Sequence, residues 1–340
     1  MLYISTRNKN EHYTANRALM EDRTADGGYF LPFRYEPFTA VQLEQMPNQS
    51  FGDTVAQVLN VFFHAGLSGW DVDCCVGKAP VKLEAMSRRV IIGELWHNPD
   101  GQFRYIRDAL YRKLCNGKFS DHISGWADIV IRVSVLFGIY GMLCKSGINE
   151  FDVCVNIGDF SRPLAVWFAK KLGLPVTMII CASNENSASW DLIHRGELNT
   201  GLNTVHTNLP ALDVGMPPYL EHLIHLVFGH DEAAKFLAAV NKKGIYSIRP
   251  DMQAVLNKDL FVSVVGKDRI GSLINSTYRS NQYILDPYTA VSLGSLQDYR
   301  AKVGESRPTV VLAEDTPARY LQAVISATGL NEKQILDHIH

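Results

Sequence analysis

Residues 151–181 constrain the fold of this chain most, because they alternate between strand and helix patterns. The segment Phe151–Asn156 predicts a strand, and residues 158–161 predict a turn. Residues 163–172 have a helical pattern, and residues 175–181 again resemble a strand. A strand, a helix and a second strand in this order form a βαβ unit, so the two strands lie parallel. We therefore predict an α/β fold in which the turn lies where parallel sheets bind ligands.

The rest of the chain adds elements of the same kind. Residues 126–143 have apolar side chains at helical spacing and predict a core helix. Residues 81–94 predict a short helix or turn that leads into a buried strand. The further elements that we predict are helices at 217–229 and 231–240 and strands at 255–265 and 309–312. With 340 residues, 46% of them hydrophobic, the chain can bury a large core, and we predict one α/β domain over residues 1–340.

Charge and cysteine content narrow the classes of partner and compartment. The net charge of −2 and the pI near 6.6 do not favour nucleic acid or an anionic membrane surface as a partner. The N-terminus becomes polar within ten residues, and we expect no apolar run of membrane-spanning length. The six cysteines lack metal-type spacing, and a reducing cytoplasm suits them best.

Residues 94–105 read ELWHNPDGQFRY and resemble a cofactor-attachment segment. The similar segment of threonine synthases is E-L-F-H-G-P-T-x-A-F-K-D, whose lysine forms the Schiff base with pyridoxal phosphate (PLP). Arg104 stands at the lysine position here. A guanidinium stays protonated and is a very poor imine former, so Arg104 cannot replace that lysine in the chemistry.

The resemblance to threonine synthases extends along the chain in the family's order. The other similar segments are residues 3–8, 24–32, 158–175, 182–186, 285–291 and 311–320. The resemblance implies the fold type II architecture of PLP enzymes, with a parallel-sheet core like the large domain of threonine synthase. It also implies that the turn made by Gly158, Asp159, Phe160, Ser161 and Arg162 corresponds to the family's G-N-F-G-D phosphate turn.

Departures from the family pattern fall where the cofactor would lie. Asp159 replaces the asparagine of the phosphate turn, and Ser161 replaces its second glycine. Glu314 stands where the family places a hydroxyl beside the pyridine nitrogen. A carboxylate repels a phosphate dianion, although Arg162 can bind one. We predict that PLP, the cofactor expected from the family, has been lost and that the chain has no other cofactor.

A deletion in the sequence points in the same direction. The family's S-G-D-T-G turn is missing, and residues 103–119 run almost directly into a segment that resembles S-I-N-W-A-R-I. We therefore expect the small domain to be largely deleted. The predicted regions are an N-terminal threonine synthase-like part (1–80), a remnant of the lysine segment (81–125) and a C-terminal α/β part (126–340).

Several polar residues are candidates with equally plausible structural roles. His97 is a possible pocket residue, but a capped helix start explains it as well. Asn184 and Asn186 follow a strand, where asparagine is also common in turns and N-caps. Glu221 and His225, or His222 and His225, have helical spacing but no evident third ligand, so we predict no metal site.

We interpret the chain as a cytoplasmic threonine synthase-like pseudoenzyme that acts by binding. Its ligand would be a small anionic metabolite or a protein partner, and we expect a homo-oligomer. One alternative is an active PLP-dependent threonine synthase or lyase of amino-acid metabolism that uses another lysine, with Lys113, Lys118 and Lys145 nearest in sequence. A second alternative is a PLP-independent enzyme that reuses the pocket, with Arg104, Asp159, Arg162 and Glu314 as its polar residues.

Overall fold

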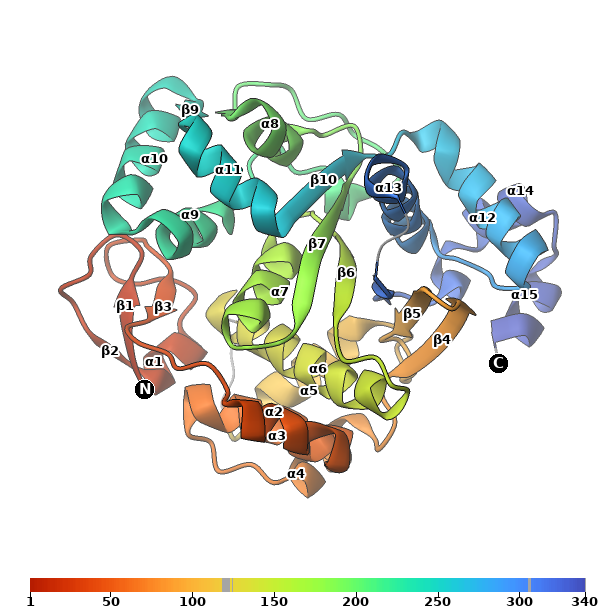
Figure 1. Ribbon diagram of the computed structural model, residues 1–340, viewed down its shortest axis with the longest axis horizontal. Coiled ribbons are helices and arrows are strands. Elements are labelled where there is room, and N and C mark those ends of the chain that lie inside the picture. Colours follow the sequence, from red (N-terminus) through yellow and green to blue (C-terminus); the bar gives the residue numbers. More distant parts are fainter. Residues whose placement is uncertain (118–122, 124, 305–306, 340) are drawn as a thin grey trace.

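The computed structural model describes residues 1–117, 123, 125–304 and 307–339. Within these residues six strands form the central sheet, in the spatial order β10-β7-β6-β11-β5-β4. Their bounds are β4 (Lys82–Ser87), β5 (Val90–Glu94), β6 (Phe151–Asn156), β7 (Val176–Ser183), β10 (Leu260–Val264) and β11 (Thr309–Ala313). Neighbouring strands are parallel except for β4 and β5, which pair antiparallel. The predicted α/β fold with a mostly parallel sheet is confirmed (Figure 1).

Helices cover both faces of the sheet, because the central strands are apolar on both sides. On one face Val153 and Val155 of β6 join a cluster with α6 (Gly125–Lys145) and α7 (Ser161–Lys171). On the other face Cys154 packs with residues of α13 (Pro287–Val303). The βαβ unit predicted from residues 151–181 is therefore confirmed, and it is made of β6, α7 and β7.

The remaining elements surround this core (Figure 1). Two small antiparallel sheets join β1 (Leu2–Ser5) with β2 (Tyr13–Thr14) and β3 (Phe30–Pro32), and β8 (Glu197–Asn199) with β9 (Ile245–Ser247). The N-terminal helices are α1 (Ala15–Met20), α2 (Ala40–Gln45), α3 (Phe51–Phe63), α4 (Gly69–Val76) and α5 (Phe103–Leu114). The later helices are α8 (Ala188–Arg195), α9 (Leu220–Phe228), α10 (His230–Lys243), α11 (Pro250–Asp259), α12 (Lys267–Asn281), α14 (Leu321–Thr328) and α15 (Glu332–Ile339). Short 3-10 helices are η1 (Met46–Asn48), η2 (Pro210–Leu212) and η3 (Pro317–Tyr320).

Two segments differ from the sequence prediction. Residues 81–94 form the hairpin β4–β5 and not a helix or turn before one strand. Because β4 is an edge strand, it carries polar residues such as Lys82 and Glu84, which hid the strand pattern. In the predicted strand 255–265, helix α11 starts at Pro250 and continues to Asp259, so only Leu260–Val264 is extended.

Helix α6 also corrects an expectation. Among the described residues, this helix of 21 residues has the length and the apolar composition that crossing a membrane requires. The sequence analysis expected no such run. In this structure 89% of its most apolar window is buried inside the protein, so α6 acts as the core helix that residues 126–143 predicted. The division into regions 1–80, 81–125 and 126–340 and the deletion of a small domain stay predictions. Lys118, Phe119, Ser124 and His340, which some of the predictions include, lie outside the described residues.

Candidate functional site

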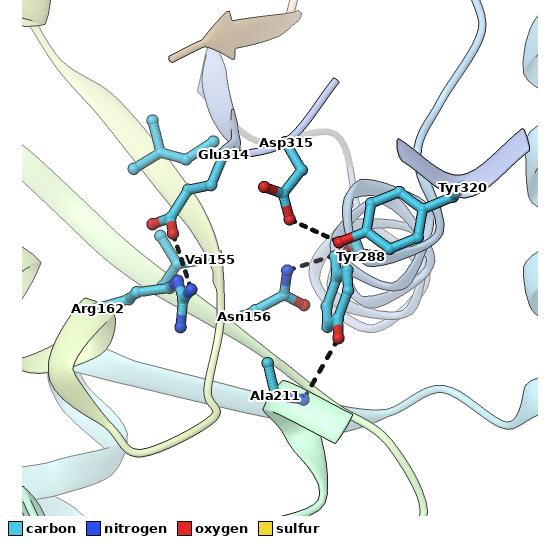
Figure 2. Close-up of a pocket in the computed structure, with 9 residues that line it drawn as sticks. Val155, Asn156, Arg162, Ala211, Tyr288, Glu314, Asp315 and Tyr320 are labelled. Atoms are coloured by element: carbon cyan, nitrogen blue, oxygen red, sulfur yellow. Dashed lines mark hydrogen bonds and ion pairs between the residues drawn. The ribbon is translucent and has the colours of Figure 1, made fainter. Parts of the chain in front are cut away.

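The candidate site lies at the carboxyl ends of the parallel strands β6 and β11. Asn156 is the last residue of β6, and Glu314 directly follows β11. A cavity of about 110 Å³ lies here (Figure 2), at the sheet edge where α/β proteins bind ligands. Its lining residues are Val155, Asn156, Arg162, Ala211, Tyr288, Leu312, Glu314, Asp315 and Tyr320.

A buried ion bridge forms one wall of the cavity. Glu314 Oε1 accepts from Arg132 Nη1 at 2.6 Å, and Glu314 Oε2 accepts from Arg162 Nη2 at 2.7 Å. Arg132 lies on α6, and Arg162 is the second residue of α7, so the bridge links two helices to the end of β11. Burial alone would raise the pKa of Glu314, but the charges of Arg132 and Arg162 outweigh burial and hold this pKa at about 2. Glu314 is therefore ionised across the physiological pH range.

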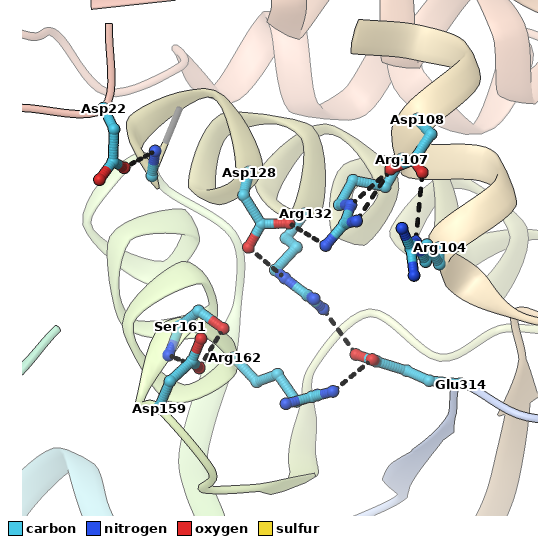
Figure 3. A network of polar contacts seen from close by, with 11 residues as sticks. Asp22, Arg104, Arg107, Asp108, Asp128, Arg132, Asp159, Ser161, Arg162 and Glu314 are labelled. Carbon is cyan, nitrogen blue, oxygen red and sulfur yellow. Dashed lines mark hydrogen bonds and ion pairs between the residues drawn. The ribbon is translucent and has the colours of Figure 1, made fainter. Parts of the chain in front are cut away.

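The ion bridge is the inner end of a longer polar network (Figure 3). Arg132 Nε donates to Asp128 Oδ2 at 2.9 Å, and Arg107 lies within 3.8 Å of Asp128. Arg107 also contacts Asp108 at 2.9 Å, and Asp108 accepts from Arg104 Nε at 3.3 Å. The side chain of Arg104, in the first turn of α5, is 71% exposed.

The expected grouping of Arg104 with Arg162 and Glu314 in one pocket is therefore corrected. Arg104 lies at the outer end of the network and is not among the residues that line the cavity. Its place beside Glu314 is taken by Arg132, which the sequence analysis did not single out. Arg162 does contact another residue of that group, since it pairs with the carboxylate of Glu314.

The turn between β6 and α7 is closed by its own aspartate. Asp159 Oδ1 accepts from the backbone N–H of Ser161 at 2.9 Å and from its hydroxyl at 2.6 Å. The first N–H of α7, which would be an anion-binding donor, thus already has an anionic partner. Gly158 has a φ of +50°, and a Cβ there would lie 2.8 Å from the carbonyl oxygen of Ala211, so only glycine fits. Phe160 is also left-handed, with a φ of +76°.

The other pocket candidates lie elsewhere. His97 Nε2 is 2.6 Å from Glu94 Oε2, and its ring stacks on Trp96 beside a separate cavity of about 200 Å³. Asn184 and Asn186 both donate to Asp213 Oδ1, at 2.7 Å and 3.1 Å, and so hold the loop that precedes α9. Neither asparagine lines the cavity beside Glu314.

The acidic and histidine residues considered as metal ligands make other contacts, and the cysteines form no disulfide bonds. Within the described residues no group of three or more His, Cys, Asp or Glu side chains comes together to hold a metal ion. Glu221 instead accepts from Thr6 and from Arg7, which lies 3.1 Å away. Burial lowers the pKa of His222 to about 3, so this ring is neutral. All six cysteines are free thiols.

Comparison of the sequence with known proteins finds similarity to threonine synthases, as the motifs predicted. The family model described as the threonine synthase N terminus matches residues 2–79. The chain is 26% identical over 214 residues to threonine synthase-like 1 from Homo sapiens, which covers 62% of this chain and 27% of that protein. It is 29% identical over 179 residues to threonine synthase from Pseudomonas aeruginosa, which covers 51% of this chain and 37% of that protein. The chain thus matches only about a quarter to a third of the length of these relatives.

The fold matches more completely than the sequence. The crystal structure of PLP-bound threonine synthase from Brucella melitensis aligns with a TM-score of 0.84 and 18% identity, and the match covers 100% of both chains. The structural match shows that the chain has the fold of threonine synthase, and the sequence matches support a threonine synthase-like protein. In this family's fold the cavity beside Glu314 lies at the carboxyl edge of the sheet, where the sequence resemblance places the degenerate phosphate turn.

The sequence analysis of this threonine synthase-like chain missed several residues around the cavity. Asp315 and Tyr320 follow β11 and lie within the similar segment 311–320. Asp286 caps α13 by accepting from the N–H groups of Tyr288 and Thr289, and burial raises the pKa of Asp286 to about 7. All three residues lie within segments that resemble threonine synthases, and this resemblance was the signal that could have marked them as site residues.

Proposed function

We propose that this chain retains the fold of the PLP-dependent enzymes and acts by binding, without PLP chemistry. The observation that carries this proposal is the Arg132–Glu314–Arg162 ion bridge beside the sheet edge that corresponds to the family's cofactor site. A site that binds a charged cofactor needs charged groups that are free to pair with the cofactor. The charges of Arg132, Glu314 and Arg162 are already paired with one another within the protein.

The available amines support the proposal. Of the described residues that line the cavity, none is a lysine. Arg104, at the expected lysine position, carries a guanidinium and is exposed. Lys113 pairs with Asp71 at 2.8 Å, and Lys145 donates to the carbonyl of Gln49, so neither of these alternatives lines the cavity. Lys118 lies outside the described residues.

The phosphate turn and the size of the cavity also do not fit PLP. The carboxylate of Asp159 holds the N–H of Ser161 and repels a second anion. The cavity holds about 110 Å³. An engineered protein cavity of about 150 Å³ takes one unsubstituted benzene ring, so a substituted pyridine with a phosphate group is too large. We therefore derive no reaction step through this cofactor.

The paired charges of the ion bridge also limit which ligands the chain can bind. Arg132 and Arg162 are offset by Asp128 and Glu314, which leaves no unpaired guanidinium in the ion bridge for a small anionic metabolite. A protein partner, including a second copy of the chain, is the better supported part of the proposal. Trp70 on α4 is 73% exposed, and such a large exposed apolar side chain is available to contact a protein partner. We further propose a cytoplasmic location, which suits six free thiols.

An absorbance spectrum of the purified protein tests the proposal against an active PLP enzyme. An internal imine of PLP with a lysine absorbs visible light, so we expect a colourless protein even after incubation with excess PLP and dialysis. Borohydride reduction followed by mass spectrometry should find no pyridoxyl-lysine. Arg104→Lys is the matched variant, and it should stay colourless because the side chain of residue 104 is 71% exposed and does not line the cavity. A reducible lysine adduct in the wild-type protein would reject the proposal.

A further inference from the structure

The cavity beside the ion bridge contains a buried acceptor without a donor. Asn156 is 8% exposed, and its Nδ2 donates to the backbone carbonyl of Tyr288 at 3.1 Å. That carbonyl can only accept, so it fixes the orientation of the Asn156 amide. The Asn156 Oδ1 has no hydrogen-bond partner in the described part of the chain. Because buried acceptors are nearly always paired, the cavity needs a hydrogen-bond donor that the protein does not supply.

The other walls are acidic and aromatic (Figure 2). Asp315 accepts from the hydroxyl of Tyr320 at 2.7 Å, and the guanidinium of Arg319 is 3.9 Å away. The rings of Tyr288 and Tyr320 meet edge to face with centroids 5.6 Å apart. The Tyr288 hydroxyl accepts from the N–H of Ala211 at 3.3 Å. Carboxylates and aromatic faces together favour an organic cation.

The balance of charge agrees with a cationic ligand. The ion bridge and the adjoining Asp128 together contain two arginines and two carboxylates, so this group adds no net charge. Burial raises the pKa of Asp315, although the hydrogen bond from Tyr320 acts in the opposite direction. Behind Tyr288, burial also raises the pKa of Asp286, to about 7. Arg319 is the cation nearest Asp315 among the ion pairs of the described residues, and its side chain is 45% exposed. Of the charged residues that line the cavity, two are carboxylates, Glu314 and Asp315, and one is a guanidinium, Arg162.

We propose that this cavity binds a small primary ammonium ion. Its N–H groups would donate to Asn156 Oδ1 and to the carboxylate of Asp315, and its carbon chain would lie against the rings of Tyr288 and Tyr320. Scaling from one benzene in about 150 Å³, a cavity of about 110 Å³ takes a ligand of about four or five heavy atoms. The inference rests on the proposed absence of PLP, because the cofactor and the amine would compete for the same space.

Binding is tested with n-propylammonium chloride, with n-propanol and tetramethylammonium chloride as controls at equal ionic strength. Thermal unfolding and saturation-transfer NMR report the binding. We expect propylammonium to raise the melting temperature and to give a saturation-transfer signal, and we expect neither control to do so. Propanol keeps the length of the ligand without its charge, and tetramethylammonium keeps the charge without an N–H donor. An equal response to either control would overturn the proposal.

Variants locate the site. Asp315→Asn and Asn156→Leu should each weaken propylammonium binding at least tenfold, because each removes one acceptor. Asp251→Asn is the control, since Asp251 pairs with Arg249 on the surface and does not line the cavity. If Asp315→Asn does not fold, Asn156→Leu carries the test alone. Unchanged binding in a folded variant of either residue would place the ligand elsewhere and reject the site.

The outcome is separable from the outcome for the proposed function. A colourless protein that ignores propylammonium rejects the ammonium site and leaves the proposed lack of PLP chemistry intact. A protein that carries reducible PLP rejects the proposed function, whatever its response to propylammonium.

Discussion

Substitution of Glu314 tests whether the ion bridge stabilises the fold as a buried element. Glu314→Gln keeps the shape of the side chain and removes the charge that Arg132 and Arg162 share at 2.6 Å and 2.7 Å. The three side chains are only 10%, 17% and 22% exposed for Arg132, Glu314 and Arg162, so water screens the lost charge weakly. Removing one partner of a buried pair costs about 3–5 kcal/mol, and the partial exposure places our expectation near about 3 kcal/mol. At about 2 °C per kcal/mol for a large chain, the melting temperature should fall by about 6 °C.

The assay is urea unfolding followed by circular dichroism, with Glu150→Gln as the matched control. Glu150 pairs with Arg307 at 3.0 Å, but its side chain is 56% exposed, so water screens this pair and its loss should cost far less than the loss of Glu314. The depressed pKa of Glu314 adds a signature in pH. Its contribution should be full above pH 4.5 and should decrease as the pH falls from 4.5 toward 2. If Glu314→Gln changed the free energy of unfolding no more than Glu150→Gln, the reasoning that the bridge is a buried structural element would be refuted.

Three further predictions follow from the same network and its surroundings. Arg104→Ala should change the free energy of unfolding by less than about 0.5 kcal/mol in the same urea assay, because this side chain is 71% exposed; a loss above about 2 kcal/mol would contradict its placement. Asp286→Asn should flatten the pH dependence of the melting temperature between pH 4 and 7, since the pKa of Asp286, raised from 3.8 to about 7, makes the folded wild type lose stability as pH rises through that window. Asp213→Ala should cost about 2 kcal/mol and speed limited proteolysis of residues 200–216, because it removes the acceptor shared by Asn184 and Asn186; unchanged proteolysis would contradict that role.

The fold was largely predictable because its central strands are buried on both faces. Every residue of β6 is buried and four of the six are apolar, so the segment can be read as a strand without strict alternation of apolar and polar residues. The edge strand β4 has intermediate and exposed residues only, so its sequence lacked that signal. Boundaries also depended on local caps, as Pro250 shows at the start of α11.

The candidate site was predictable in place and not in its contacts. The turn after β6 follows from the topology of a parallel sheet, and residues 158–162 do lie at its carboxyl edge. The partner of Glu314 did not follow, because Arg132 is 182 residues away in sequence. A signal was present nonetheless, since Asp128 and Arg132 are a charged pair four residues apart within an otherwise apolar helix. Buried charges are rarely left unpaired, so such a pair in a core helix points toward a third partner at a site.

The two carboxylates that depart from the family pattern solve one physical problem, if PLP has been lost as we propose. Without an anion at this edge, the N–H of Ser161 and the guanidinium of Arg162 would be buried donors without acceptors, which proteins avoid. Asp159 supplies an acceptor to Ser161 at 2.9 Å, and Glu314 supplies one to Arg162 at 2.7 Å. Each carboxylate thus occupies a donor that a bound anion would otherwise use. For this reason a lysine at position 104 alone cannot restore a cofactor site, because Asp159 and Glu314 would still hold its donors.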